Sequence, residues 1–174
     1  ALQAALADLP ALAPFVQALQ QRLAAEGTPE QVARDLAGAY ARLFHGAGGR
    51  RSAPPCASFY LSDRARMMQA EAGDTRAVLD ALDLRLSSEM REPPDHVAVQ
   101  LAVMAHLVET ADGPTQASWL ASRLLPWLDA FAARCAQAPR PDIYASAARA
   151  AADFCANDLG QLGDAARPQS ARVS

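Results

Sequence analysis

The clearest structural signal in the chain is EPPDHVAVQLAVMAHLV, residues 92–108. The paired prolines Pro93 and Pro94 hold the chain out of helix, because proline lacks an amide hydrogen and restricts the residue before it. The segment that follows is apolar almost all round, which is typical of a central, buried helix. We expect Asp95 and His96 in its first turn, where the helix dipole and free backbone amides favour a carboxylate.

The composition of the whole chain favours helix as well. Of the 174 residues, 42 are Ala and 21 are Leu, and both residue types favour helix. The β-branched residues that sheets prefer are scarce, with eight Val, one Ile and four Thr. We therefore predict an all-α fold.

Charge and hydropathy exclude several classes of protein. The net charge is −3 and all 16 basic residues are Arg, so the chain lacks the basic excess of a general nucleic-acid binder. It has no apolar run of about 20 residues and no visible secretory signal, so we expect no membrane span. The three cysteines, Cys56, Cys135 and Cys155, are scattered and odd in number, which favours buried thiols in a reducing compartment.

Proline and glycine divide the rest of the chain into further helices. Apolar residues recur at helical spacing from Pro14 to Gly27. Thr28 is expected to cap the next helix in a capping box with Gln31, and that helix should end at Gly46. The glycine- and proline-rich residues 46–58 are expected to form a loop.

Four more helical segments are expected after this loop. A short one should cover about residues 60–72, and Asp74 is a plausible N-cap for another that carries Val78, Leu82 and Leu86. Gly113 and Pro114 should end the central helix. Helices over 116–137 and 141–160 follow, and the polar tail after Gly163 is expected to be disordered.

Residues 92–96 are the leading candidate for a functional site, and two interpretations stay open. In the first, Asp95 is a helix cap and His96 bonds to a neighbouring lobe. In the second, Glu92, Asp95 and His96 form a rigid polar binding corner between two helical lobes. A catalytic Asp95–His96 pair is a weaker alternative, because no Ser or Cys lies in a recognisable nucleophile elbow.

Other candidate sites give weaker signals. His96 and His106 lie about 15 Å apart along one helix and cannot share an ion, so no metal site is predicted. Residues 46–49 lack the spacing and the lysine of a phosphate-binding loop. Phe59 and Tyr60, beside Pro54 and Pro55, either line a groove for an extended peptide or anchor the loop on the core.

Three segments, in this order, resemble the TorD/DmsD/NarJ family of redox-enzyme maturation chaperones. They are YARLF (40–44) with ASFY (57–60), then EPPDH (92–96), and then LPWLDAF (125–131). The EPPDH stretch is the most specific, and the third segment looks closest to the TorD branch. The resemblance implies a helical lobe over 1–91, a hinge at 92–96, a second lobe over 97–163 and a disordered tail over 164–174.

The resemblance also implies a function. A chaperone of this kind is not an enzyme; it acts in the cytoplasm, as a monomer or a domain-swapped dimer. It binds the twin-arginine signal peptide and the apo form of a molybdoenzyme, and it assists insertion of the molybdenum cofactor before export by the twin-arginine (Tat) pathway. The expected client is a trimethylamine N-oxide or dimethyl sulfoxide reductase, with a formate dehydrogenase or nitrate reductase as the alternative. No resident cofactor is implied, although weak binding of a guanine nucleotide is.

The residues that match this role combine acidic groups with an apolar wall, as a cationic and apolar peptide requires. We expect the signal peptide to contact Tyr40, Leu43, Phe44, Pro55, Ser58, Tyr60, Glu92, Asp95 and His96. Two other classes of function stay open from the sequence. One is a hydrolytic enzyme that uses Asp95 and His96, and the other is a purely structural helical adaptor.

Overall fold

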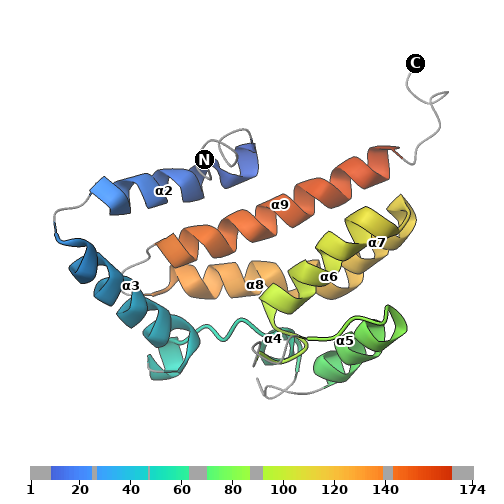
Figure 1. The fold of residues 1–174 in the computed structure, drawn as a ribbon, viewed down its shortest axis with the longest axis horizontal. Coiled ribbons are helices and arrows are strands. Elements are labelled where there is room, and N and C mark those ends of the chain that lie inside the picture. Colours follow the sequence, from blue (N-terminus) through green and yellow to red (C-terminus); the bar gives the residue numbers. More distant parts are fainter. Residues whose placement is uncertain are drawn as a thin grey trace. The chain divides into compact units, whose positions relative to one another are not determined.

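The fold was analysed in a computed structural model, which describes residues 9–24, 27–46, 48–62, 70–86, 92–138 and 143–165. Helices account for nearly all of this structure, and the only β-type pairing within these residues is an isolated antiparallel bridge between Cys56 and His96. The prediction of an all-α fold is therefore confirmed (Figure 1).

The chain divides into two compact units. Unit 1 comprises residues 1–54 and 128–154, and unit 2 comprises residues 55–127 and 155–174. Two helices, α8 (Leu125–Ala136) and α9 (Ile143–Ala165), contribute residues to both. This division follows spatial contacts, and the lobe boundaries expected from the sequence stay a prediction.

Unit 1 contains the first helices of the chain. A short 3-10 helix, η1 (Pro10–Leu12), leads into α2 (Ala13–Ala24), and α3 (Pro29–Phe44) follows. The predicted capping box at the start of α3 is confirmed, since the Thr28 side chain accepts a hydrogen bond from the Gln31 amide and the Gln31 side chain accepts one from the Thr28 amide. Helix α3 stops where expected, because Gly46 has a φ of 78°, which glycine adopts without strain.

Unit 2 contains the short helix α4 (Ala57–Leu61), then α5 (Ala70–Ala81), the central α6 (Val97–Thr110) and α7 (Gly113–Trp119). A π-helical turn, η3 (Leu120–Leu124), joins α7 to α8. Helix α6 buries one face, with Val99, Val103 and Leu107 in the core, but Val108 is 57% exposed. The expectation that α6 would be buried all round is therefore wrong on that side.

Several helix boundaries also differ from the prediction. Helix α5 begins at Ala70, so Asp74 lies inside it and pairs with Arg123 at 2.7 Å instead of capping it; α5 ends at Ala81, before Leu82. Gly113 and Pro114 open α7 after the N-cap Asp112, whose side chain accepts from the Thr115 amide. Among residues 60–72, positions 63–69 lie outside the described residues.

The end of the chain also departs from expectation. Asp164 and Ala165 belong to α9, although the predicted disordered tail starts at 164. The remainder of that tail, residues 166–174, lies outside the described residues. No helix in the described ranges combines the length and the apolar character that a membrane span requires.

A buried polar network holds α5, α6 and α8 together within unit 2. The Gln100 side chain donates to Thr75 Oγ1 at 3.4 Å and accepts from Trp127 Nε1 at 3.0 Å, while its backbone carbonyl accepts from Trp119 Nε1 at 3.1 Å. Gln100 is 1% exposed, so these bonds replace water for a fully buried amide.

We expect Gln100→Leu to lower the free energy of unfolding by about 1–2 kcal/mol. The loss is moderate because each partner keeps a second bond. Thr75 Oγ1 donates to the Glu71 carbonyl at 3.0 Å, and Trp127 Nε1 donates to the Arg123 carbonyl at 3.0 Å. Urea unfolding followed by circular dichroism measures the change, and an unchanged midpoint would show that the network adds no stability.

Candidate functional site

Residues 55–58 and 92–96 form a compact corner of unit 2, which we call the Asp95 corner. The Val97 amide donates to the Pro55 carbonyl at 2.8 Å, and the Ala57 amide donates to the Asp95 carbonyl at 3.1 Å. These two bonds form the isolated bridge between Cys56 and His96. The paired prolines keep residues 92–94 out of helix, so the chain can make this pairing before α6 begins.

Asp95 is the most buried charged side chain of this corner, with 0% of its surface exposed. Its Oδ2 accepts a hydrogen bond from the Ser58 amide at 2.8 Å, in the first turn of α4. The Cys56 side chain makes no capping bond there, so Asp95 caps α4 from 37 residues away. Its other oxygen, Oδ1, accepts no hydrogen bond from the residues that the structure describes.

A buried carboxylate oxygen without a donor is unusual, because nearly all buried polar atoms are hydrogen-bonded and an unmade bond costs free energy. The Ser58 hydroxyl oxygen is also buried and has no hydrogen-bond partner among the described residues. The Asp95 corner therefore contains two buried polar atoms whose hydrogen-bonding capacity is unused by the described residues.

His96 caps α6, and its ring links that helix to Glu92. Nδ1 accepts from the Ala98 amide at 3.1 Å, and Nε2 lies 3.5 Å from Glu92 Oε2. Because Nδ1 is an acceptor, the neutral ring carries its proton on Nε2, which faces Glu92. Helix α6 starts at Val97, so the expectation that Asp95 and His96 lie in its first turn is wrong; both precede it and act as caps.

The pKa of the Cys56 thiol reflects the burial and the negative charge of this corner. Burial, followed by the negative charges of Asp95 and Glu92, raises the pKa of its thiol from 9.0 to about 12. Burial and the charge of Asp158 raise the pKa of Cys155 to about 11. Both thiols are therefore protonated at neutral pH, and neither is an activated nucleophile.

We expect iodoacetamide at pH ~8 to alkylate Cys56 and Cys155 at least about tenfold more slowly in the folded protein than in the guanidinium-unfolded chain. The raised pKa values also make the stability depend on pH. The protonated thiols stabilise the folded state, and this stabilisation is lost as the pH rises from about 9 towards 12. Mass spectrometry of labelled peptides measures the rates. Labelling of Cys56 at the unfolded rate would contradict the assignment.

Of the other predicted residues of unit 2, Pro55 and Ser58 belong to the Asp95 corner, and Tyr60 lies two residues beyond it in α4. Pro55 is buried and accepts the hydrogen bond from Val97. Tyr60 stacks on Trp127 with ring centroids 5.6 Å apart and meets Phe59 edge-to-face at 5.1 Å. The sequence leaves open whether Phe59 and Tyr60 line a groove or anchor a loop, and the stacking on Trp127 favours anchoring.

Tyr40, Leu43 and Phe44 lie on α3 in unit 1 and form a second group. Tyr40, which is 37% exposed, lies 5.0 Å from Phe44 and 5.6 Å from Tyr144, between ring centroids. Phe44 also contacts Phe131, at 6.1 Å. Leu43 is buried. The nine predicted site residues thus fall into two groups, one in each unit, and Phe131 and Tyr144 join the α3 group although the sequence did not single them out for the site.

Comparisons with known proteins identify the family. The family described as the nitrate reductase delta subunit matches residues 4–133. The chaperone protein TorD of Vibrio cholerae serotype O1 (Classical Ogawa 395) is 32% identical over 88% of this chain and 74% of its own length. The chain belongs to the TorD/DmsD/NarJ family of redox-enzyme maturation chaperones.

Further TorD chaperones agree with this assignment. TorD of Shewanella loihica is 32% identical over 91% of this chain and 76% of its own length, and TorD of a Psychrobacter species is 37% identical over 77% and 65%. These relatives are chaperones and not enzymes, so this member of the family is a chaperone rather than the hydrolase that an Asp95–His96 pair would suggest.

The Asp95 carboxylate and the His96 ring are used as caps for two different helices, which is a structural role. Within the described ranges, no group of three His, Cys, Asp or Glu side chains is placed to hold a metal ion.

Proposed function

We propose that this chaperone binds the twin-arginine signal peptide and the apo form of a molybdoenzyme in the cytoplasm. It assists insertion of the molybdenum cofactor before export by the Tat pathway. It acts without a resident cofactor, as a monomer or a domain-swapped dimer, and weak guanine-nucleotide binding is a secondary expectation of the family resemblance.

The buried Asp95 carboxylate is the observation that carries this proposal. Its Oδ1 has no donor among the described residues, and an arginine guanidinium presents several N–H donors in a planar fork that matches a carboxylate. The half-buried Glu92 lies beside His96 and supplies a second negative charge nearer to solvent. A peptide with two adjacent arginines would meet Glu92 at the surface of the Asp95 corner, and it would reach Asp95 Oδ1 by opening the corner, because Asp95 is 0% exposed.

The proposal also predicts selectivity for arginine over lysine. A lysine ammonium is a compact, strongly hydrated charge and cannot make the paired, coplanar bonds of a guanidinium. We expect the apolar part of the peptide to contact aromatic side chains of the site, of which Tyr40 is the most exposed in the described residues.

The identity of the molybdoenzyme that the chaperone serves, its client, is the more specific part of the proposal. The similar curated proteins are TorD chaperones, which favours a trimethylamine N-oxide or dimethyl sulfoxide reductase. A nitrate reductase or formate dehydrogenase is the alternative, and the description of the matching family model favours the former of these two.

Calorimetric titration with signal peptides tests the proposal. The probes are the leader peptides of the reductases encoded in the same genome, each in its native form and with Lys-Lys in place of Arg-Arg. We expect at least one native leader to bind, with an affinity at least about tenfold higher than that of its Lys-Lys form.

Two results would overturn this function. If the folded chain binds none of the native leaders, the signal-peptide role is wrong. If it binds the Arg-Arg and Lys-Lys forms equally, it recognises apolar segments as a helical adaptor would, and the Asp95 corner has no part in selectivity.

A further inference from the structure

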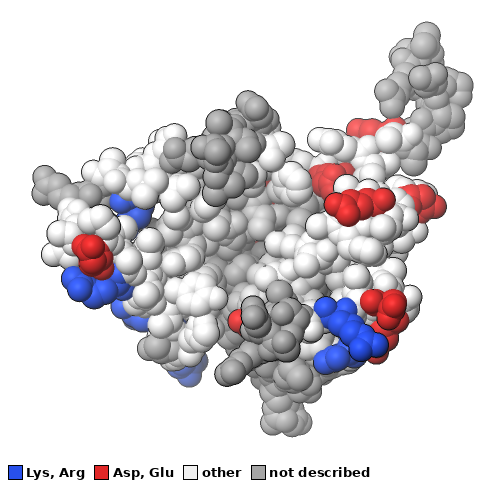
Figure 2. Space-filling model, in the orientation of Figure 1, with Lys and Arg blue, Asp and Glu red and all other residues white. Residues whose placement is uncertain are grey.

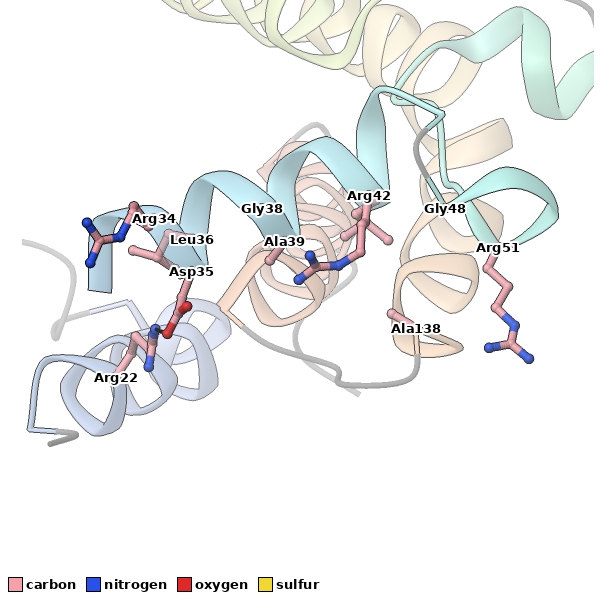
Figure 3. A pocket seen from close by; sticks show the side chains of 11 residues that line it. Arg22, Arg34, Asp35, Leu36, Gly38, Ala39, Arg42, Gly48, Arg51 and Ala138 are labelled. Atoms are coloured by element: carbon pink, nitrogen blue, oxygen red, sulfur yellow. Dashed lines mark hydrogen bonds and ion pairs between the residues drawn. The ribbon is translucent and has the colours of Figure 1, made fainter. Parts of the chain in front are cut away.

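Unit 1 contains a surface pocket that the proposed function does not use. It lies along α3 and has a volume of about 780 Å³. Its charged lining consists of four arginines and one aspartate, a formal charge of +3 on a chain whose net charge is −3. These residues are Arg22, Arg34, Asp35, Arg42 and Arg51, and we call the site the arginine pocket (Figure 3).

Most of this positive charge is uncompensated. Arg22 pairs with Asp35 at 3.0 Å, whereas Arg34, Arg42 and Arg51 make no ion pair with any residue that the structure describes. Figure 2 shows basic side chains gathered over the part of unit 1 formed by α3. Figure 3 shows Arg42 and Arg51 on either side of Ala138, while Arg34 points away from them.

The guanidinium of Arg42 occupies the space that is left free by the missing side chain of Gly38. A Cβ built at Gly38 would lie 3.2 Å from Nη1 of Arg42, so the guanidinium lies against the bare backbone one helical turn before its own residue. The pocket lining also includes the aliphatic residues Leu36, Ala39, Leu43 and Ala138.

The segment that carries Arg51 is fixed against α3. The Gly48 amide and the Ser52 hydroxyl donate to the Arg42 carbonyl at 3.0 and 3.2 Å, and a Cβ at Gly48 would lie 2.5 Å from that oxygen. The Arg134 side chain donates to the carbonyls of Arg50 and Ser52, at 2.8 and 2.6 Å. The backbone that supports both arginines is therefore pre-organised, which lowers the entropic cost of binding.

The hydrogen-bond donors around the arginine pocket indicate which class of anion it would bind. The amides of Gly48, Gly49, Arg51 and Ser52 already donate to backbone carbonyls, so this loop offers no cradle of free amides for a phosphate. The pocket lining also lacks an aromatic ring on which a nucleotide base could stack, within the residues described. Guanidinium forks in a pocket that also has aliphatic lining residues match the carboxylates and methylenes of an acidic peptide.

We propose that the arginine pocket binds an acidic segment of a partner protein, whose carboxylates pair with Arg42 and Arg51. This inference goes beyond the proposed function, because the pocket repels the cationic leader that the Asp95 corner attracts. The two sites therefore take opposite charges, and either can be lost without the other.

Fluorescence anisotropy with a defined probe tests the pocket. The probe is a fluorescein-labelled peptide in which glutamates alternate with leucines and alanines, and its control has glutamine in place of each glutamate. The variants are Arg42→Gln/Arg51→Gln and, as a matched loss of two charges on exposed helical and loop positions of unit 2, Arg76→Gln/Arg85→Gln. Arg51→Glu alone provides a second pocket variant on an exposed segment, should the double variant fold poorly.

We expect the double pocket variant to lose affinity for the glutamate peptide by about tenfold or more, and Arg51→Glu to lose a similar amount, while the Arg76/Arg85 control keeps its affinity within about twofold. Equal binding of the glutamine peptide, or equal loss in the control variant, would overturn the proposal. Competition with GTP and with inorganic triphosphate separates the alternative. If these bind through Arg42 and Arg51 while the glutamate peptide does not, the pocket is a phosphate site and the proposal is wrong.

Discussion

Asp95→Asn is expected to weaken binding of a native twin-arginine leader by about 30-fold. The replacement keeps the shape of the side chain, and an amide oxygen can still accept the hydrogen bond from the Ser58 amide that Oδ2 accepts at 2.8 Å. What it removes is the negative charge, and it places N–H donors at the position of Oδ1, which in our proposal accepts from the leader. The loss therefore reports the charge of a buried carboxylate and not the integrity of the α4 cap.

The matched control for this variant is Asp80→Asn. Asp80 lies exposed on α5 in the same unit, so the replacement changes the net charge of the chaperone by the same amount away from the Asp95 corner. We expect it to bind the leader within about twofold of the unmodified chain. Calorimetry with the Arg-Arg and Lys-Lys leaders measures both variants.

The ratio of the two affinities is the sharpest measurement. In the unmodified chain the Arg-Arg leader should bind more tightly than the Lys-Lys leader, and in Asp95→Asn this preference should largely disappear. A variant that keeps full affinity for the Arg-Arg leader would show that Asp95 is only a helix cap, as in the first interpretation from the sequence, although the helix it caps is α4 and not the one that follows it.

The parts of the fold that depend on short-range interactions could be predicted from the sequence. The capping box of Thr28 and Gln31 involves residues three apart, and the stop at Gly46 needs only a residue that tolerates positive φ. The assignment of Asp74 as an N-cap failed for the opposite reason. Its carboxylate pairs with Arg123, 49 residues away, and no local pattern reveals that partner.

The candidate site shows the same division. The sequence indicated a rigid polar corner at residues 92–96, because two prolines followed by Asp and His are a local signal. It could not show that Asp95 caps α4, since that bond joins residues 37 apart. The arginine pocket was missed because its lining comes together only when the loop after α3 folds back on the Arg42 carbonyl.

A signal for the pocket was nevertheless present. Arg34 and Arg42 lie on one helix, and the Arg50-Arg51 pair follows in a glycine-rich loop. The pair resembles an export signal, but it is internal and no apolar segment follows it, so the sequence alone gives it no function. The relevant property of Arg51 is that its backbone segment is fixed against α3, and this is visible only in the three-dimensional structure.

Trp127 is the residue whose loss should damage the fold most. It is 0% exposed, its ring stacks on Tyr60, and its Nε1 donates to both the Gln100 side chain and the Arg123 carbonyl, each at 3.0 Å. Removal of the indole leaves a large cavity and deprives Gln100 Oε1 of its buried donor. Both effects lower the stability of unit 2.

We expect Trp127→Ala to lower the free energy of unfolding by about 3–5 kcal/mol. Trp127→Phe is the matched variant, because it keeps an aromatic ring against Tyr60 and loses only the indole donor and part of the volume, at about 1–2 kcal/mol. Far-ultraviolet circular dichroism in urea measures both, since tryptophan fluorescence changes with the substitution itself. If the two variants had equal free energies of unfolding, the packing of the ring would contribute nothing and only its hydrogen bonds would matter. The expected result, with the alanine variant much less stable than the phenylalanine variant, would show that most of the stabilisation comes from the packing of the buried ring.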